Sequence, residues 1–240
     1  MKSILEFNDG EVVVVASRPG EGKTLFMLNS ALYYLLAYPE RKVLYFSLDF
    51  HRFQIIRKML RIIGKEANSE YIRKLLDNFL NFTLDDGLED VENKMLKYLY
   101  SQDELISVVF IDYIQLITCK HSDLYNFIDE WSKRYSVPIV LATQYDPPAV
   151  LDEQYNLMAE EYNLMAKKYN LSGEKYIFKI RHNISNYRDL HKHCSRIIEV
   201  KFISEENTIT IKENDFSRIY KCNIEKLSGK IEWENQIMPL

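Results

Sequence analysis

Residues 12–24 constrain the fold more than any other segment, because a run of β-branched residues leads straight into a turn and an apolar helix. The segment reads Val-Val-Val-Val-Ala-Ser-Arg-Pro-Gly-Glu-Gly-Lys-Thr, and an apolar stretch begins at Leu25. In this order of strand, turn and helix, backbone N–H groups of the turn and of the helix N-terminus face an anion. The segment therefore predicts a phosphate-binding loop with the candidate residues Ser17, Arg18, Pro19, Gly20, Glu21, Gly22, Lys23 and Thr24.

The last residues of the loop carry the most specific chemistry. In such loops a lysine reaches the β- and γ-phosphates and the next hydroxyl holds Mg²⁺, and Lys23 and Thr24 stand at these positions. The full pattern has a glycine five residues before Gly22, where this chain has Ser17. A plain glycine-rich turn is the alternative, but the strand before the loop, the Pro-Gly turn and the helix after it all favour nucleotide binding.

Size and composition favour one large α/β domain in a reducing compartment. The chain has 240 residues, 47% of them hydrophobic, and a net charge of −4, which does not indicate a globally basic nucleic-acid binder. The three cysteines form no CxxC pair, so structural zinc is not expected. There is no signal-peptide pattern, and the longest apolar stretch, residues 25–38, is too short to span a bilayer. We expect a cytoplasmic protein without a membrane partner.

Strand and helix patterns alternate along the first part of the chain, as in a mainly parallel sheet flanked by helices. Strands are expected at residues 11–16, 43–48, 107–111 and 138–142. Helices are expected at residues 23–37, 51–63, 69–80, 88–100 and 122–135. After residue 195 the pattern changes to short strands with polar turns, at residues 196–203, 207–212, 218–224 and 230–233. The predicted α/β fold therefore ends in antiparallel edge strands.

Residues 155–175 contain a repeat with a period of seven, in which the string Tyr-Asn-Leu-Met-Ala recurs. On a helix, this period places the tyrosine and methionine side chains on one stripe, and Gly173 is expected to end the helix. The repeat is too short for a long coiled coil. Two interpretations stay open: an amphipathic helix packed on its own domain, and a helix that contacts another molecule.

Three of the predicted strands end in polar residues that suit nucleotide hydrolysis. An acid after a buried strand is costly unless it binds a metal or forms hydrogen bonds, and Asp112 follows Val-Val-Phe-Ile. Because ligands bind at the carboxyl ends of the strands in such sheets, we predict that Asp112 holds Mg²⁺. By the same argument, Asp49 orients the attacking water and Gln144 senses the γ-phosphate. The alternatives are a turn cap for Asp112, a helix N-cap for Asp49 and a surface amide for Gln144.

Together these motifs resemble the RecA-like ATPase domain of DnaB-type replicative helicases. The similar segments are residues 16–24, 46–49, 111–117 and 137–144, in the order and spacing of that family. The Arg-Pro inside the loop and the Ile-Asp-Tyr-Ile-Gln-Leu string are the most specific of these similarities. The family often begins the loop with Ala-Arg-Pro or Gly-Arg-Pro, which makes Ser17 less unusual. The resemblance covers residues 1–145 well and continues more loosely over residues 195–235.

The resemblance implies a hexameric motor that binds ATP and Mg²⁺, hydrolyses ATP and translocates on DNA. By position, Lys23 and Thr24 bind phosphate and Mg²⁺, Asp112 is the Walker B acid and Gln144 is the sensor. Asp49 stands where the family has its catalytic glutamate and is one methylene shorter, which bears on the rate of hydrolysis.

The chain also departs from the family pattern. We expect a single RecA-like domain over residues 1–240, without the N-terminal domain and linker helix of the family. The loop after Asp112, which helps to grip DNA in the family, is reduced to about residues 118–122. Residues 146–195 form a divergent insertion that carries the seven-residue repeat.

The family also places a Lys-x-Arg motif late in the chain, where it acts on the nucleotide of a neighbouring subunit. In chain order the best match gives Lys212, but Asn214 stands where the arginine belongs. The rival match has the right residues, Lys179 and Arg181, but comes early in the chain. We favour the later position and keep both Lys212 and Arg181 as candidate catalytic residues.

Two functional hypotheses follow from the sequence. The first is a P-loop ATPase of the DnaB helicase or translocase type that acts on single-stranded DNA. Basic residues in 51–74 and 179–201 could meet the phosphate backbone, although charge on a solvated helix face is the commoner explanation of such residues. The second is a nucleotide-gated regulatory or assembly subunit with weak or no hydrolysis, which uses the repeat to bind a protein partner. In both, the chain works in a homo-oligomer or in a complex with a partner protein.

Overall fold

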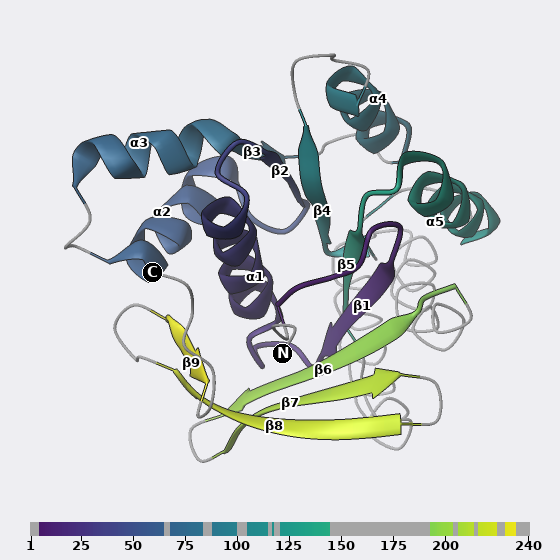
Figure 1. Cartoon of the computed structure of the whole chain (residues 1–240). Coiled ribbons are helices and arrows are strands. Elements are labelled where there is room, and N and C mark those ends of the chain that lie inside the picture. The colour runs from purple at the N-terminus through teal and green to yellow at the C-terminus, as the bar shows by residue number, and fades with distance from the viewer. Residues whose placement is uncertain are drawn as a thin grey trace, which may run out of the picture.

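The structure is a computed structural model that describes residues 5–64, 68–83, 88–99, 105–114, 117, 121–144, 193–203, 206–213, 216–224 and 229–233. Its strands are β1 (Val12–Ser17), β2 (Lys42–Ser47), β3 (Phe79–Thr83), β4 (Ile106–Asp112), β5 (Ile139–Gln144), β6 (Arg196–Ile203), β7 (Glu206–Glu213), β8 (Phe216–Ile224) and β9 (Ile231–Trp233). Its helices are α1 (Lys23–Ala37), α2 (Arg52–Ile63), α3 (Ser69–Asn78), α4 (Leu88–Leu99) and α5 (His121–Tyr135) (Figure 1).

In the described part of the chain, the strands form one sheet in the order β3-β2-β4-β5-β1-β6-β7-β8-β9. Every neighbouring pair from β3 to β6 is parallel. Strands covered on both faces are expected to be apolar along their whole length, and all residues of β1 and β4 are buried. The predicted α/β fold with a mainly parallel sheet is therefore confirmed.

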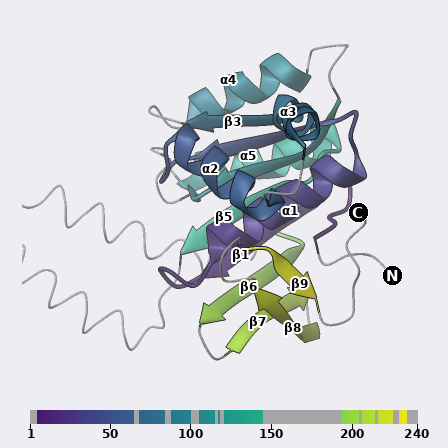
Figure 2. The same ribbon diagram turned by 90° about the vertical axis from the view of Figure 1, so that its left-hand side faces the viewer.

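The sheet changes character after β6. Each pair from β6 to β9 is antiparallel, as the short strands and polar turns of this region predict. Two views at right angles show β6, β7 and β8 continuing the sheet on the side of β1 that faces away from β5 (Figure 2). The strand β1 therefore lies inside the sheet, between β5 and β6, and the antiparallel C-terminal strands form one edge.

Helices cover both faces of the parallel strands, and each face has its own apolar core (Figure 1). On one face α1, α2 and α3 pack on the sheet through side chains that include Phe26, Leu28, Ile55, Met59 and Leu75. On the other face α4 and α5 pack through side chains that include Val91, Met95, Phe127, Ile128 and Trp131. The odd-numbered and even-numbered residues of β1 divide between these two cores, which is the alternation expected of a strand.

One boundary prediction is wrong. The helix expected at residues 69–80 ends at Asn78, and a strand that the sequence reading omits, β3, begins at Phe79. The stretch Leu-Leu-Asp-Asn-Phe-Leu reads as a continuous helix by local pattern. The strand forms because the Phe79–Thr83 backbone pairs in parallel with β2, and this non-local pairing leaves no signal within the segment itself.

Most of the predicted insertion, and the whole seven-residue repeat, lie outside the described residues. Of residues 146–195 the structure describes only 193–195. The helix predicted over this repeat, ending at Gly173, and the single-domain boundary at 1–240 stay predictions. Within the described part of the chain, no helix has both the length and the apolar character needed to span a membrane.

Candidate active site

The predicted phosphate loop connects the end of β1 to the start of α1. Ser17 is fully buried at the end of β1, and its hydroxyl donates to the carbonyl oxygen of Arg18 at 3.0 Å. The loop is tied across by two further bonds, from Arg18 N to Glu21 Oε2 at 3.1 Å and from Glu21 N to the carbonyl of Arg18 at 3.3 Å. Pro19 and Gly20 form its exposed tip.

Gly20 and Gly22 both have positive φ, 76° and 96°, which favours glycine. Their surroundings differ. Nothing lies within 4 Å of a Cβ built on Gly20, whereas a Cβ on Gly22 would overlap the ring of Phe202 in β6. The Phe202 N–H also donates to the carbonyl of Glu21 at 3.0 Å. The end of β6 therefore supports the loop from one side.

Helix α1 presents its first backbone amides to the loop. Gly22 is the N-cap residue, no side chain caps it, and no acid occupies the first turn of this helix. The first N–H groups of a helix have no partner within the helix, and its positive dipole end favours anions. An anion such as a phosphate group fits this end of α1.

Lys23 is the first residue of α1 and lies beside acidic and aromatic groups. Its ammonium is 4.8 Å from the centre of the Tyr113 ring. Burial lowers the pKa of Lys23, while the negative charges of Asp112 and Asp49 oppose that change. The side chain is therefore held near the end of β4, at the position where the sequence predicts a metal-binding acid.

Asp112 is the last residue of β4, and only 1% of it is exposed. Its Oδ2 accepts a hydrogen bond of 2.9 Å from the hydroxyl of Tyr45. Burial raises the pKa of Asp112, and the positive charge of Lys23 opposes this most strongly. The Thr24 hydroxyl also acts to lower that pKa, yet the second oxygen, Oδ1, is buried and has no hydrogen-bond partner in the described structure.

A buried carboxylate oxygen without a partner is costly unless a ligand satisfies it. Mg²⁺ prefers oxygen ligands and is usually held by one or two protein groups together with substrate phosphates. The Oδ1 atom of Asp112 and the hydroxyl of Thr24 fit that role. Among the described residues, no group of three or more His, Cys, Asp or Glu side chains could hold a metal ion by itself.

Asp49 follows the end of β2 and is exposed. Its negative charge acts on Lys23 and Asp112, which places it near both. The N-cap of α2 is His51, whose N–H donates to Gln54 Oε1 at 3.0 Å. The alternative of a helix N-cap for Asp49 is therefore wrong. Its role in orienting water stays a prediction.

Gln144 is the last residue of β5, and its backbone lies opposite Ser17 in the parallel pairing of β1 and β5. Asp112 is likewise opposite Ser47 in the pairing of β2 and β4. The carboxyl ends of these parallel strands lie at one edge of the sheet, where ligands bind in folds of this kind. The structure thus brings together the loop, Asp49, Asp112 and Gln144.

Of the two candidate positions for the trans-acting residue, the structure describes only the backbone of Lys212, which does not lie at this edge. Lys212 lies in β7, with its backbone opposite Ile197 of β6, and β6 separates β7 from β1. Arg181 lies outside the described residues, as do Lys179 and Asn214. Both assignments stay predictions.

Sequence reasoning missed two residues that shape the site, Tyr45 and Phe202. A tyrosine inside the buried strand β2 carries a usable signal, because a buried phenol nearly always finds a hydrogen-bond partner. The sequence offers no comparable signal for Phe202, which meets the loop only through the pairing of β1 with β6.

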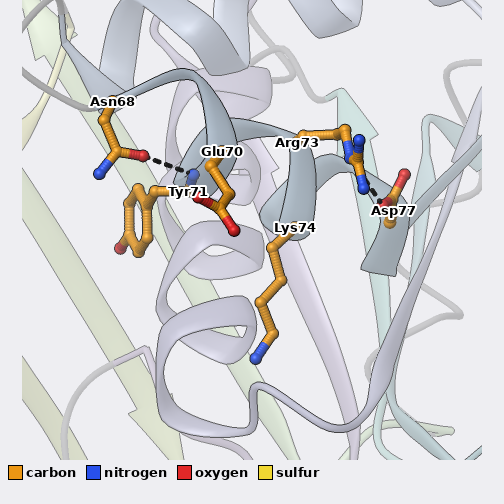
Figure 3. A pocket seen from close by; sticks show the side chains of 6 residues that line it. All are labelled: Asn68, Glu70, Tyr71, Arg73, Lys74 and Asp77. Atoms are coloured by element: carbon orange, nitrogen blue, oxygen red, sulfur yellow. Dashed lines mark hydrogen bonds and ion pairs between the residues drawn. The ribbon is translucent and has the colours of Figure 1, made fainter.

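The surface also has open grooves away from this edge. One lies along α3 and is lined by Asn68, Glu70, Tyr71, Arg73, Lys74 and Asp77 (Figure 3). Asn68 Oδ1 accepts from Tyr71 N at 2.7 Å, and the ion pair of Arg73 with Asp77 is 4.0 Å long and exposed. Exposed pairs of this kind contribute little free energy. None of these residues belongs to the loop or to the strand ends that carry the predicted chemistry.

Comparison with known proteins agrees with this geometry. Residues 2–81, which include the phosphate loop and Asp49, match the profile of the family described as "DnaB-like helicase C terminal domain". The chain is 25% identical over 166 residues to a "Probable replicative DNA helicase" of Trieres chinensis. It is 24% identical over 162 residues to "Replicative DNA helicase DnaB" of Buchnera aphidicola subsp. Baizongia pistaciae.

The aligned parts cover 58% and 56% of this chain but only 36% and 35% of those two proteins. The chain therefore spans about a third of the length of the curated relatives that it matches. None of these similarities supports the second hypothesis, a regulatory subunit without hydrolysis.

A solved structure of an ATPase domain superposes with a TM-score of 0.63 and 14% sequence identity. The superposition covers 94% of this chain and 85% of that one, so the likeness of fold extends beyond the segment matched by sequence. The family profile over residues 2–81, the helicase relatives and the shared fold therefore agree that the chain is similar to a DnaB-type C-terminal domain.

Proposed function

We propose that the chain binds ATP and Mg²⁺ at residues 17–24 and Asp112, and hydrolyses the ATP as part of a helicase-type motor on single-stranded DNA. The observation that carries this proposal is the buried, unpartnered Oδ1 of Asp112 beside Lys23 and Thr24. A chain that did not bind a cation here would leave the cost of this buried oxygen uncompensated.

Phosphoryl transfer depends mainly on positioning and on stabilising charge. The uncapped amides of α1 and the ammonium of Lys23 hold the phosphates and offset the negative charge that spreads over them. The partial burial of Lys23 strengthens this effect, because the surrounding water that screens it is reduced.

Thr24 and Asp112 hold the metal ion. A bound Mg²⁺ would supply positive charge that offsets the negative charge developing on the phosphates. The Asp112 carboxylate is tied to Tyr45 through one oxygen, so the other is free to face the ion.

Asp49 and Gln144 act on the attacking water and the γ-phosphate. Asp49 is exposed and close enough for its charge to affect Lys23, which supports a role at the solvent side of the phosphates. The backbone of Gln144 ends β5 beside the start of the loop, which supports a role for its amide in responding to the γ-phosphate. The shorter side chain of Asp49 favours slow hydrolysis.

A trans-acting cation from a neighbouring copy completes the site in this proposal, supplied by Lys212 or by Arg181. The relatives are replicative DNA helicases by name, which supports action on DNA. Arg181→Ala and Lys212→Ala distinguish the two positions, because only the variant that removes the trans-acting residue slows turnover without weakening ATP binding.

The central test measures ATP turnover by the full chain with and without single-stranded DNA. We expect turnover that DNA stimulates and that Lys23→Ala abolishes. Lys94→Ala is the matched control, because Lys94 pairs with Asp90 on α4 and lies away from the loop. ATP bound tightly but turned over at the rate of the Lys23→Ala variant, with or without DNA, would contradict the motor.

A further inference from the structure

Tyr45 reaches the metal-binding acid from a neighbouring strand. The residue is completely buried in β2, and its hydroxyl donates to Asp112 Oδ2 at 2.9 Å. In the pairing of β2 with β4, Tyr45 lies opposite Phe110 and Ser47 lies opposite Asp112. The tyrosine therefore extends along the face of the sheet that carries α1, toward the carboxyl end of β4.

Ser47 is nearer to Asp112 along the strand, but its hydroxyl is used elsewhere. It donates to the carbonyl of Phe50 at 2.7 Å and accepts from Phe50 N at 3.2 Å. These bonds close the turn after β2. The hydrogen bond that β2 gives to the Asp112 carboxylate therefore comes from Tyr45, at Oδ2, while Oδ1 is buried without a partner.

The position of the Tyr45 hydroxyl is fixed before any ligand binds. Its ring lies between Phe79 and Phe110, with ring centres 5.6 and 5.8 Å away. Asn81 Nδ2 donates to the Tyr45 carbonyl at 3.3 Å from the other neighbouring strand, β3. A completely buried ring packed in this way presents its O–H at one place without a further loss of rotamer freedom.

We propose that Tyr45 is a positioning residue for the metal: its hydroxyl occupies Oδ2 of Asp112 and leaves Oδ1 as the single oxygen that faces the Mg²⁺ of the bound nucleotide. Without this bond, the carboxylate is free to rotate about its last torsion angle, and both oxygens compete for the ion. Partners that orient metal ligands in this way typically change metal affinity by about 10- to 100-fold. The inference rests on the proposed function and adds to it a residue that does not itself touch the nucleotide.

The test compares the full chain with Tyr45→Phe, which keeps the ring and removes only the hydroxyl. Binding of a fluorescent ADP analogue is measured in EDTA and then as a function of Mg²⁺ concentration. We expect the affinity in EDTA to stay within about twofold, because the phosphate loop is unchanged. The Mg²⁺ concentration that gives half of the metal-dependent gain in affinity should rise about 10-fold or more.

Tyr34→Phe is the matched control. Tyr34 is 2% exposed, and its hydroxyl both accepts from Phe7 N at 2.7 Å and donates to the Phe7 carbonyl at 3.2 Å, away from the metal site. We expect this variant to lose stability without any change in the Mg²⁺ titration. In an Asp112→Asn background, Tyr45→Phe should have no further effect on Mg²⁺ dependence, because the tyrosine acts only through Asp112.

An unchanged Mg²⁺ titration in folded Tyr45→Phe would overturn the proposal and leave Tyr45 a packing residue. If the chain of unchanged sequence bound the ADP analogue equally with and without Mg²⁺, the proposed function would fail as well, so the two failures are distinguishable. If Tyr45→Phe does not fold, the chain of unchanged sequence with ¹³Cζ-labelled tyrosine replaces it, and the Tyr45 resonance is identified by its contacts with the rings of Phe79 and Phe110. A shift of the Tyr45 resonance when Mg²⁺ joins the ADP complex supports the proposal, and no shift overturns it.

Discussion

Phe202 packs against Gly22, so that a residue near the end of β6 forms a wall of the phosphate loop. The main chains meet at the same point, because Phe202 N donates to the Glu21 carbonyl at 3.0 Å. The loop thus has its shape fixed by two independent causes, the positive φ of its glycines and the ring beside Gly22.

Alanine substitutions at Gly20 and Gly22 distinguish the effect of a positive φ from the effect of the Phe202 ring. Gly22→Ala should lower the free energy of unfolding by about 2 to 5 kcal/mol, since a left-handed φ costs about 1 to 2 kcal/mol and overpacking against Phe202 about 1 to 3 kcal/mol. Gly20→Ala should cost only about 1 to 2 kcal/mol, because its Cβ meets open space. Urea unfolding measures both. Equal losses for the two variants would show that Phe202 yields without cost.

Asp112 gives a prediction about stability and pH. Its folded-state pKa is raised by burial, so ionised Asp112 destabilises the nucleotide-free fold at neutral pH. Asp112→Asn should therefore raise the melting temperature at pH 7 and abolish the Mg²⁺-dependent gain in nucleotide affinity. The stabilisation should shrink as the pH falls through the raised folded pKa toward the ordinary value of 3.8, because the native carboxyl is then protonated as well.

Asp9→Asn is the control for this pH series, because Asp9 is exposed at the surface. It should leave the melting temperature nearly unchanged across the same range. A lower melting temperature for Asp112→Asn at pH 7 would mean that the attraction to Lys23 outweighs the cost of burial.

Asn29 joins the start of α1 to the turn before β9. It is fully buried, donates to the carbonyl of Gly229 at 3.1 Å and accepts from Ile231 N at 3.0 Å. Asn29→Ala should cost about 2 to 4 kcal/mol, because it leaves buried backbone groups without partners. Hydrogen exchange at the Ile231 amide should speed up more than exchange in β1.

Ser30→Ala provides the comparison at the next position of the helix. Ser30 is equally buried, but its hydroxyl donates only to the Phe26 carbonyl within α1. Its loss should cost about 1 kcal/mol or less. A similar cost for both variants would contradict a special role of Asn29 in holding β9.

The length of the Asp49 side chain should limit turnover. If Asp49 orients the attacking water, Asp49→Ala should slow single-turnover ATP hydrolysis by about 100-fold, a typical contribution of a positioned base. Asp49→Glu should speed hydrolysis, because it restores the longer side chain expected at this position. Both variants should bind ADP and Mg²⁺ as the unchanged chain does. An unchanged rate in Asp49→Ala would remove it from the reaction.

Local pattern predicted much of this fold. The helix at residues 23–37 and the strand at 196–203 match the structure residue for residue, because strong periodicity and a change of polarity mark their ends. The edge of the sheet that carries the site was also predictable, since Asp112 and Gln144 each end an apolar run.

Contacts between residues far apart in the sequence could not be predicted from local sequence patterns. The strand β3 forms by pairing with β2. The phosphate loop packs against Phe202 at Gly22, and the Asp112 carboxylate accepts a hydrogen bond from Tyr45. Each of these contacts joins residues far apart along the chain, and the local sequence around either residue does not indicate its partner. The choice between Lys212 and Arg181 also stays open, because the proposed trans-acting residue would act on a site in another molecule.

The position of β6 beside β1 has a consequence for how the molecule is made. The phosphate loop ends at Thr24, but the strand that supports it and the ring beside Gly22 come after residue 195. During synthesis the loop therefore leaves the ribosome long before its own wall, and the first helices and strands assemble with one flank of β1 bare. Contacts between such distant residues are slow to form. The loop is thus completed late in synthesis and folding, only after β6 and Phe202 have been made.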